Sequence, residues 1–143
     1  MIILDTNVLS ALMSRTPDQQ VIVWLDKQPG TSVWTTSITL LEIRFGLQAL
    51  PVGKRRALLV QAFETVMTDK IDGRITSFDA AAAQLAGDLM AMRNKKGRPS
   101  DLRDTMIAGI VLAYRATLAT RHTSHFEDLS VPVINPWASE KHL

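Results

Sequence analysis

The sequence predicts an α/β fold of three layers, in which helices flank a central, mostly parallel sheet of four to five short strands. Short apolar runs rich in β-branched residues alternate along the chain with longer segments of helical periodicity. The first run, at residues 2–4, is apolar throughout, which is typical of a strand buried on both faces of a parallel sheet. With 143 residues, 46% of them hydrophobic and 21% charged, the composition indicates one globular domain, expected over residues 1–143.

Three small polar residues, Asp5, Thr6 and Asn7, follow the first strand. Their side chains suit the free amides at a helix start, and an apolar helical run continues at residues 8–13. Asp5 is therefore a candidate helix N-cap. Its place at the carboxyl end of a strand also suits a functional role, because open α/β sheets bind their ligands at that end.

The second helix is expected at residues 18–28, because Pro17 and Asp18 suit its first turn and Pro29 ends it. Its single apolar face is formed by Val21, Trp24 and Leu25. A short run rich in β-forming residues predicts the second strand at residues 32–35.

The next helix is expected at residues 38–50, where Pro51 ends it, and it carries Glu42. Helical spacing places Glu42 beside the predicted apolar stripe, and a buried carboxylate needs a partner. That partner is either an arginine, with Arg44 and Arg56 as candidates, or a cation shared with another acid. The predicted stripe consists of Ile38, Leu41, Phe45 and Ala49.

Two further helices are expected at residues 54–68 and 80–94, with a short strand at residues 74–76 between them. Gly97 and Pro99 prevent the second of these helices from continuing. A new helix must therefore begin after them.

That last long helix is expected at residues 100–114, with Asp101 and Asp104 near its start. Asp104 has the helical spacing of Ile107 and Val111, which predicts that it points inward. Asp101 should cap the helix or point elsewhere. The helix dipole favours acids at this end by ~0.3 to 1 kcal/mol, but it does not explain an acid that points inward.

Strands at residues 117–120 and 131–134 complete the predicted sheet. Asp5 lies at the carboxyl edge of this sheet, and the helices that carry Glu42 and Asp104 begin from the same edge. Three converging carboxylates need a counter-charge. Because the chain has no cysteine, the natural choice is a hard divalent cation, and Mg²⁺ fits because it binds through a few carboxylates and bridges to phosphate.

Basic residues are clustered, although the formal net charge is only +2. One cluster lies at residues 54–56, and the other comprises Arg93, Lys95, Lys96 and Arg98. Such clusters either follow a phosphate backbone or form solvated helix faces. The lack of cysteine excludes disulfides, and no apolar run reaches the ~18 residues of a membrane span. We expect a cytoplasmic protein without a membrane partner.

Several segments, taken together in their order along the chain, are a more specific indication of a protein family than any one of them alone. The set comprises the strand ending in Asp5-Thr6-Asn7-Val8, residues 37–46 around Glu42, residues 97–99 followed by residues 104–108, residues 118–121, and Asn135-Pro136-Trp137. The set covers essentially the whole chain. It closely resembles the PIN-domain nucleases, and most closely their VapC/FitB-like toxin branch.

The resemblance implies a Mg²⁺-dependent ribonuclease, with Mn²⁺ as an alternative ion, that is the toxin of a type II toxin–antitoxin pair. It also implies an RNA substrate, a small DNA-binding antitoxin of the VapB/FitA kind that docks at the acidic site, and a homodimer. The expected reaction is in-line hydrolysis of a phosphodiester bond. The match assigns metal coordination and catalysis to Asp5, Glu42 and Asp104, and supporting polar roles to Thr6, Asn7 and Thr120.

One departure lies in the loop after residue 120. Family members usually have Asn or Asp at the position of His122, and often Asp at that of His125. The fourth acidic position is thus absent, which leaves open whether a second metal binds and whether Asp101 substitutes for the missing acid. Both histidines are expected at the surface rather than as ligands.

Two rival functions differ in what they require of the sequence. One is a catalytically weakened PIN-fold protein that acts only within a complex. The other, a haloacid-dehalogenase-type phosphatase, would need an acid at the position of Asn7.

Overall fold

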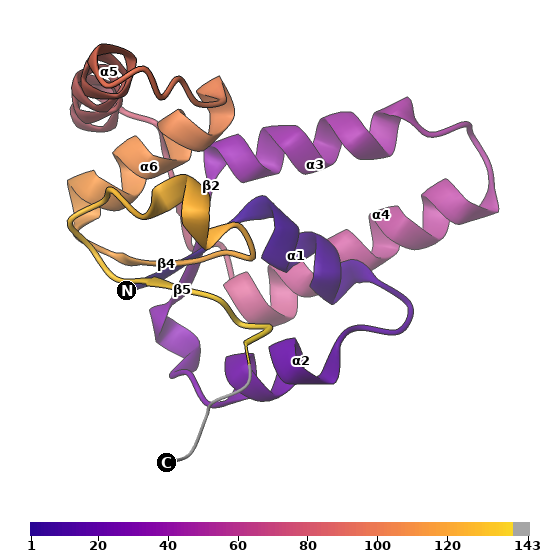
Figure 1. The fold of residues 1–143 in the computed structure, drawn as a ribbon. Helices are drawn as coiled ribbons and strands as arrows, with labels where there is room; N and C mark the ends of the chain where they lie inside the picture. Colours follow the sequence, from indigo (N-terminus) through magenta and orange to yellow (C-terminus); the bar gives the residue numbers. More distant parts are fainter. Residues whose placement is uncertain (139–143) are drawn as a thin grey trace.

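The computed structural model describes residues 1–138, which form a parallel sheet between two layers of helices (Figure 1). Within these residues the sheet has five strands in the order β3-β2-β1-β4-β5, and every neighbouring pair is parallel. The strands are β1 (Ile2–Leu4), β2 (Val33–Thr36), β3 (Ile75–Thr76), β4 (Thr117–Ala119) and β5 (Val133–Ile134). This confirms the predicted fold class. Residues 139–143 of the expected domain lie outside the described residues.

The helices begin and end close to the predicted positions. They are α1 (Thr6–Met13), α2 (Gln19–Asp26), α3 (Ser37–Ala49), α4 (Lys54–Val66), α5 (Ala80–Lys95) and α6 (Leu102–Tyr114). The largest difference follows α4, where a wider π-helical turn, Met67–Ile71, continues the helix. Asp72 then adopts a left-handed conformation with φ of 50° and reverses the chain toward β3.

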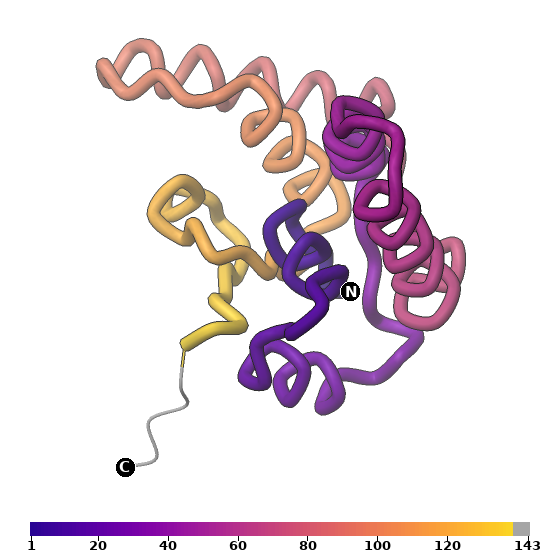
Figure 2. Tube along the Cα trace, turned by 90° about the vertical axis from the view of Figure 1, so that its right-hand side faces the viewer, coloured from indigo at the N-terminus to yellow at the C-terminus, as the bar shows by residue number. Residues whose placement is uncertain are grey.

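Two hydrophobic cores lie on opposite faces of the sheet, because successive side chains of β1 point to opposite faces. Leu4 contributes to the core shared with α1, α2, α3 and α4, and Ile3 contributes to the core shared with α5 and α6. Both side chains are fully buried. Figure 1 shows α5 and α6 at the upper left of the sheet and α1, α2 and α4 to the right of it and below. The side view in Figure 2 shows α3 and α4 next to each other along one flank.

The predicted apolar stripe of α3 is confirmed at Ile38 and wrong at its other three positions. The buried side chains of α3 are Ile38, Thr39, Ile43 and Leu47. Leu41 and Phe45, which were expected to be buried, are 58% and 69% exposed. The helix carries two apolar stripes, and packing against the sheet buries the one with Ile43 and Leu47. The Thr36 hydroxyl caps the helix by accepting from the Thr39 amide at 3.1 Å.

The order of the strands places a crevice at the carboxyl end of β1. The chain connects β1 to one neighbour, β2, and only later adds β4 on the other side. Ligands of open α/β sheets bind at such a reversal of strand order. Asp5 follows β1 and its amide still pairs with the Ala119 carbonyl at 2.9 Å, while Thr120 follows β4. Of the helices described, none is both long and apolar enough to cross a membrane.

Candidate functional site

Asp5 is both a helix cap and a buried acid at the crevice. Its side chain is almost fully enclosed, with the residue 3% exposed. One carboxylate oxygen, Oδ1, accepts from the Thr6 amide at 2.8 Å and so caps α1. The other, Oδ2, accepts from the Thr120 hydroxyl at 2.8 Å and from the Asn7 side-chain amide at 3.2 Å. The N-cap interpretation of Asp5 is therefore confirmed, and its functional role stays a prediction.

Burial raises the pKa of Asp5 above its ordinary value, and the nearby Asp104 charge adds to the increase. Hydrogen bonds from Thr120, Thr6 and Asn7 act in the opposite direction but do not offset the burial. Burial thus disfavours the ionised form of the Asp5 carboxyl, and a nearby positive charge would favour it.

Asn7 and Thr120 join the turn after β1 to the turn after β4. The Asn7 amide donates to Thr120 Oγ1 at 3.2 Å, and its Oδ1 accepts from the Arg121 backbone amide at 3.0 Å. The backbone amide of His122 also donates to Thr120 Oγ1, at 3.1 Å. The predicted supporting residues therefore fix the two loops that surround Asp5.

Glu42 reaches the same place from the middle of α3. Its Oε1 accepts from the Thr6 hydroxyl at 2.9 Å, and its Oε2 lies 3.7 Å from Nη1 of Arg103 on α6. The partner is thus Arg103, and neither Arg44 nor Arg56, the candidates from the sequence, takes this place; Arg56 donates to Gln48 instead. The spacing of residues along α3 could not indicate Arg103 as the partner of Glu42, because Arg103 lies on α6.

Burial also raises the pKa of Glu42, and the charges of Asp5 and Asp104 add to the effect. The Thr6 hydroxyl and the Arg103 guanidinium lower it, but the net direction is upward. The charges of Asp5 and Asp104 thus act on Glu42, and that of Asp104 acts on Asp5. That the three acids share one metal ion stays a prediction.

Asp101 and Asp104 have different roles at the start of α6. Asp101 is the N-cap, and its Oδ1 accepts from the amides of Arg103 at 2.9 Å and Asp104 at 3.2 Å. Asp104 instead directs Oδ2 at Nδ1 of His125, 3.2 Å away. Capping therefore accounts for Asp101, as the sequence allowed.

His122 caps one short 3-10 turn, η3 (Thr123–Phe126), and His125 lies within it; their rings stack with centroids 5.1 Å apart. The His125 side chain is 51% exposed, which agrees with the predicted surface position. Its contact with Asp104 was not predicted, because it depends on how this turn packs against α6.

The chemistry of the donor set suits a hard divalent cation, since Asp5, Glu42 and Asp104 offer only carboxylate oxygens. In the conformation described for residues 1–138, no three side chains among His, Cys, Asp and Glu are gathered closely enough to hold a metal ion. The acids are therefore neighbours at one crevice whose carboxylates would have to turn toward a shared ion.

Thr39 is a site residue that reasoning from the sequence missed. It is fully buried, and its hydroxyl lies 3.0 Å from that of Thr6, the residue that donates to Glu42. Its spacing of three residues from the cap residue Thr36 was the signal that could have found it.

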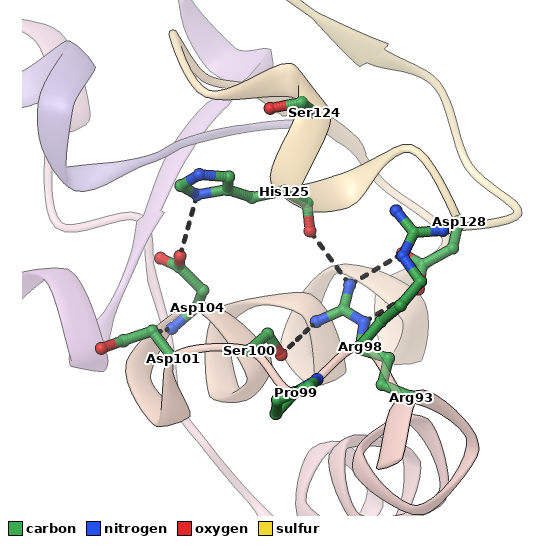
Figure 3. A pocket seen from close by; sticks show the side chains of 9 residues that line it. All are labelled: Arg93, Arg98, Pro99, Ser100, Asp101, Asp104, Ser124, His125 and Asp128. Atoms are coloured by element: carbon green, nitrogen blue, oxygen red, sulfur yellow. Dashed lines mark hydrogen bonds and ion pairs between the residues drawn. The ribbon is translucent and has the colours of Figure 1, made fainter. Parts of the chain in front are cut away.

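A cavity of about 320 Å³ opens beside Asp104 (Figure 3). Its lining residues are Arg93, Arg98, Pro99, Ser100, Asp101, Asp104, Ser124, His125 and Asp128. Arg93 was expected in a basic surface cluster, yet it is only 4% exposed and pairs with Asp128. That pair lowers the pKa of the Asp128 carboxyl below its ordinary value.

Comparison with known proteins gives one family throughout. The family model for the PIN domain matches residues 2–130. VapC ribonuclease Y4jK of Sinorhizobium fredii is 39% identical over 137 residues, covering 96% of this chain and 98% of that protein. Toxin FitB of Neisseria gonorrhoeae is 33% identical over 137 residues, with coverage of 96% and 99%.

Solved structures agree with the sequence relatives. The complex of FitAB bound to an IR36 DNA fragment contains a chain that superposes with a TM-score of 0.88 at 33% identity, over the full length of both chains. FitAcB from Neisseria gonorrhoeae gives a TM-score of 0.85, also at 33% identity, over 96% of this chain and 99% of that one. The chain therefore belongs to the PIN-domain family, in its branch of VapC- and FitB-like toxins.

Proposed function

We propose that this protein is a metal-dependent endoribonuclease that hydrolyses RNA phosphodiester bonds and serves as the toxin of a VapBC-type toxin–antitoxin pair. The observation that carries the proposal is the meeting of Asp5, Glu42 and Asp104 at the crevice, where burial and mutual repulsion raise the pKa of two of the three. Relatives named as a VapC ribonuclease and as a toxin support the chemistry and the role.

Asp5, Glu42 and Asp104 would hold Mg²⁺, or Mn²⁺ in its place, through carboxylate oxygens. When bound, such a cation polarises a phosphoryl oxygen and lowers the pKa of a water molecule. Its charge would also offset the burial, and the smaller effect of repulsion, that raise the pKa of Asp5 and Glu42. The neighbouring acids would thus favour cation binding over the empty state.

The other residues orient these acids. Thr120 and Asn7 hold Asp5, and Thr6 and Arg103 hold the two oxygens of Glu42. In the hydrolysis that we propose, a water oxygen bonds to phosphorus in line with the departing group and the bond from phosphorus to O3′ breaks. The products are a 3′-hydroxyl and a 5′-phosphate. The chain's own contribution is largely the positioning of charge before the reaction begins.

The proposal is tested by Asp5→Asn and Asp104→Asn in a cleavage assay on single-stranded RNA with Mg²⁺ or Mn²⁺. Each substitution should reduce cleavage by about a hundredfold or more, because it removes a preorganised charge. Asp79→Asn is the matched control, since Asp79 caps α5 after the edge strand β3, which lies two strands from β1, and Asn caps about as well. Full activity in either site variant, or an equal loss in the control, would contradict the three-acid site.

A second candidate is a PIN-fold binding protein with weakened catalysis that acts only within a complex. The observation in its favour is His122, which stands where family members usually have Asn or Asp. Metal binding without any turnover of RNA, with either Mg²⁺ or Mn²⁺, would favour this candidate. Metal-dependent turnover that disappears in Asp104→Asn would exclude it.

We propose a VapB/FitA-like antitoxin as partner and a homodimer in the cytoplasm as the assembly. Solved structures of the toxin FitB and of VapC proteins as complexes with their antitoxins support the partner. The exposed Leu41 and Phe45 on α3 support self-association, since they offer a helix face without cover in residues 1–138. Phe45→Glu should shift the protein toward a monomer in analytical ultracentrifugation, whereas Val52→Glu, at an 89% exposed position beyond the end of α3, should not.

A further inference from the structure

Arg93 is a buried cation that the proposed reaction does not use. It lies in the last turn of α5, and its guanidinium forms a two-pronged pair with Asp128: Nε donates to Oδ2 at 2.8 Å and Nη2 to Oδ1 at 2.7 Å. Nη1 donates to the Ser100 hydroxyl at 2.8 Å, and Nη2 also donates to the His125 carbonyl at 3.1 Å (Figure 3). All three guanidinium nitrogens are therefore engaged.

These contacts join three segments that are distant in sequence. They connect α5 to Ser100, which precedes α6, and to η3 with the residues that follow it. The Ser100 hydroxyl lies 2.9 Å from that of the buried Thr105, which in turn donates to the Asp101 carbonyl at 2.9 Å. Arg93 thus fixes the first turn of α6 on one side of Asp104 and the backbone of His125 on the other.

Arg93 is buried, whereas the Asp128 side chain is 24% exposed. Stability alone does not explain a buried guanidinium well, because an ion pair taken out of water is often no more stabilising than apolar residues of the same shape. The pair instead fixes the position of η3 relative to the start of α6. The His125 ring is half exposed, so surrounding side chains only partly enclose it. Its contact with Asp104 therefore requires the His125 backbone to keep a fixed position beside α6. Arg93 is the side chain that bonds to that backbone.

We propose that Arg93 is a positioning residue of the nuclease site: with Asp128 it holds η3 and the start of α6 in the register that directs the His125 imidazole onto the Asp104 carboxylate. The proposal rests on the proposed function in one respect, that Asp104 acts in RNA cleavage. The contact itself is independent of that function. A held Asp104 enters the reaction already oriented, so loss of Arg93 should reduce kcat more than it raises KM.

The chain provides a matched control in the neighbouring residue. Glu127 pairs with Arg98 at 3.0 Å and joins the residues after η3 to the connection between α5 and α6, but both side chains are about 60% exposed. Exposed pairs contribute little. Asp128→Asn and Glu127→Gln therefore make the same chemical change one residue apart, the first in the pair with the buried Arg93 and the second in the exposed pair with Arg98.

The first measurement is the NMR signal of the His125 imidazole in metal-free protein, assigned by substitution among the three histidines of the sequence. In the wild type, Asp104→Asn should shift this signal because the two side chains touch. In Arg93→Gln and in Asp128→Asn, the further change Asp104→Asn should no longer shift it. In Glu127→Gln the response should remain as in the wild type.

The second measurement is RNA cleavage well below the unfolding temperature. Arg93→Gln should lower kcat about tenfold or more with little change in KM, and Arg93→Lys should recover only part of this, because an ammonium cannot make the two-pronged pair. Leu89→Ala, a buried change on the same helix, controls for lost stability and should leave kcat unchanged.

Two results would overturn the inference: a His125 signal that still responds to Asp104→Asn in the Arg93 and Asp128 variants, or a Leu89→Ala variant that reproduces the loss in kcat. If Arg93→Gln does not fold, Asp128→Asn decides both measurements, because it keeps the shape of the side chain. If the wild type cleaves no RNA, the proposed function fails while the NMR result still decides the role of Arg93 in placing His125.

Discussion

A single carboxylate shows how the site balances charge. Asp5 is surrounded by three donors, from Thr6, Asn7 and Thr120, yet burial still raises its pKa. Donors that completely satisfied the charge would leave little reason for a cation to bind. The local chemistry therefore holds Asp5 in a defined position without neutralising it.

Asp128 is the opposite case, and it leads to a pH prediction. Hydrogen bonds from Arg93 lower its pKa below the ordinary 3.8, so its stabilisation is present above that value and is lost as the pH falls through the lowered pKa. Asp128→Asn should reduce the free energy of unfolding at pH 7 by about 2 kcal/mol. The difference from the wild type should shrink only below pH 3.8, measured by urea unfolding across a pH series.

Glu127→Gln is the control for this series, since its exposed partner Arg98 contributes little. A difference between wild type and Asp128→Asn that stayed constant into strong acid would show that ionisation of Asp128 is not the source of the stabilisation.

The sequence could indicate some of these residues and not others. Asp5, Thr6 and Asn7 could be found because a strand, an acid and a helix start are adjacent in the chain. The pairs of Glu42 with Arg103 and of Arg93 with Asp128 could not, because each joins separate elements and no local pattern links their positions.

Among the elements, α5 and α6 pack closely at Gly109. A Cβ atom there would lie 2.4 Å from the Ala82 carbonyl oxygen and 2.7 Å from Ala86 Cβ. The side-chain-free surface of Gly109 is thus what allows α6, the helix that carries Asp104, to approach α5.

Gly109→Ala should therefore destabilise the protein by about 1–3 kcal/mol, because the helices must move apart. Gly87→Ala on α5 meets nothing within 4 Å and should stabilise it by roughly 0.5–1 kcal/mol through improved helix propensity. Urea unfolding tests whether the free energy of unfolding falls in Gly109→Ala and rises in Gly87→Ala. Equal effects would mean that the contact between these helices is looser than described.

Element positions were predictable from the sequence to within a few residues, because Pro, Gly and capping residues mark their ends. The face of α3 was not. A helix with Leu41 and Phe45 on one side and Ile43 and Leu47 on another satisfies the same periodicity either way, and only packing against the sheet decides between the two faces.

For the whole molecule, the three acids belong to elements that meet only in the folded state. Asp5 follows β1, Glu42 lies on α3 and Asp104 on α6. An ion held by all of them would bind the folded chain and not the unfolded one. Ion binding should consequently stabilise the fold as a whole.

Mn²⁺ at about a hundredfold excess over its dissociation constant should raise the free energy of unfolding by about 2.7 kcal/mol. Asp104→Asn should lose most of this gain, measured as the shift in melting temperature on adding the ion. Potassium chloride of equal ionic strength controls for screening. The same shift in wild type and variant would place the ion elsewhere on the protein.

The central position of β1 has a consequence for the synthesis of the chain. β1 pairs with β2 on one side and with β4 on the other, and Thr120 beyond β4 bonds to Asp5. A nascent polypeptide emerging from the ribosome has its first strand ready early but must wait for more than a hundred further residues before Asp5 receives this partner. The assembled crevice thus arrives late in translation, and we expect an abortive fragment that stops short of β4 to lack the contact between Asp5 and Thr120.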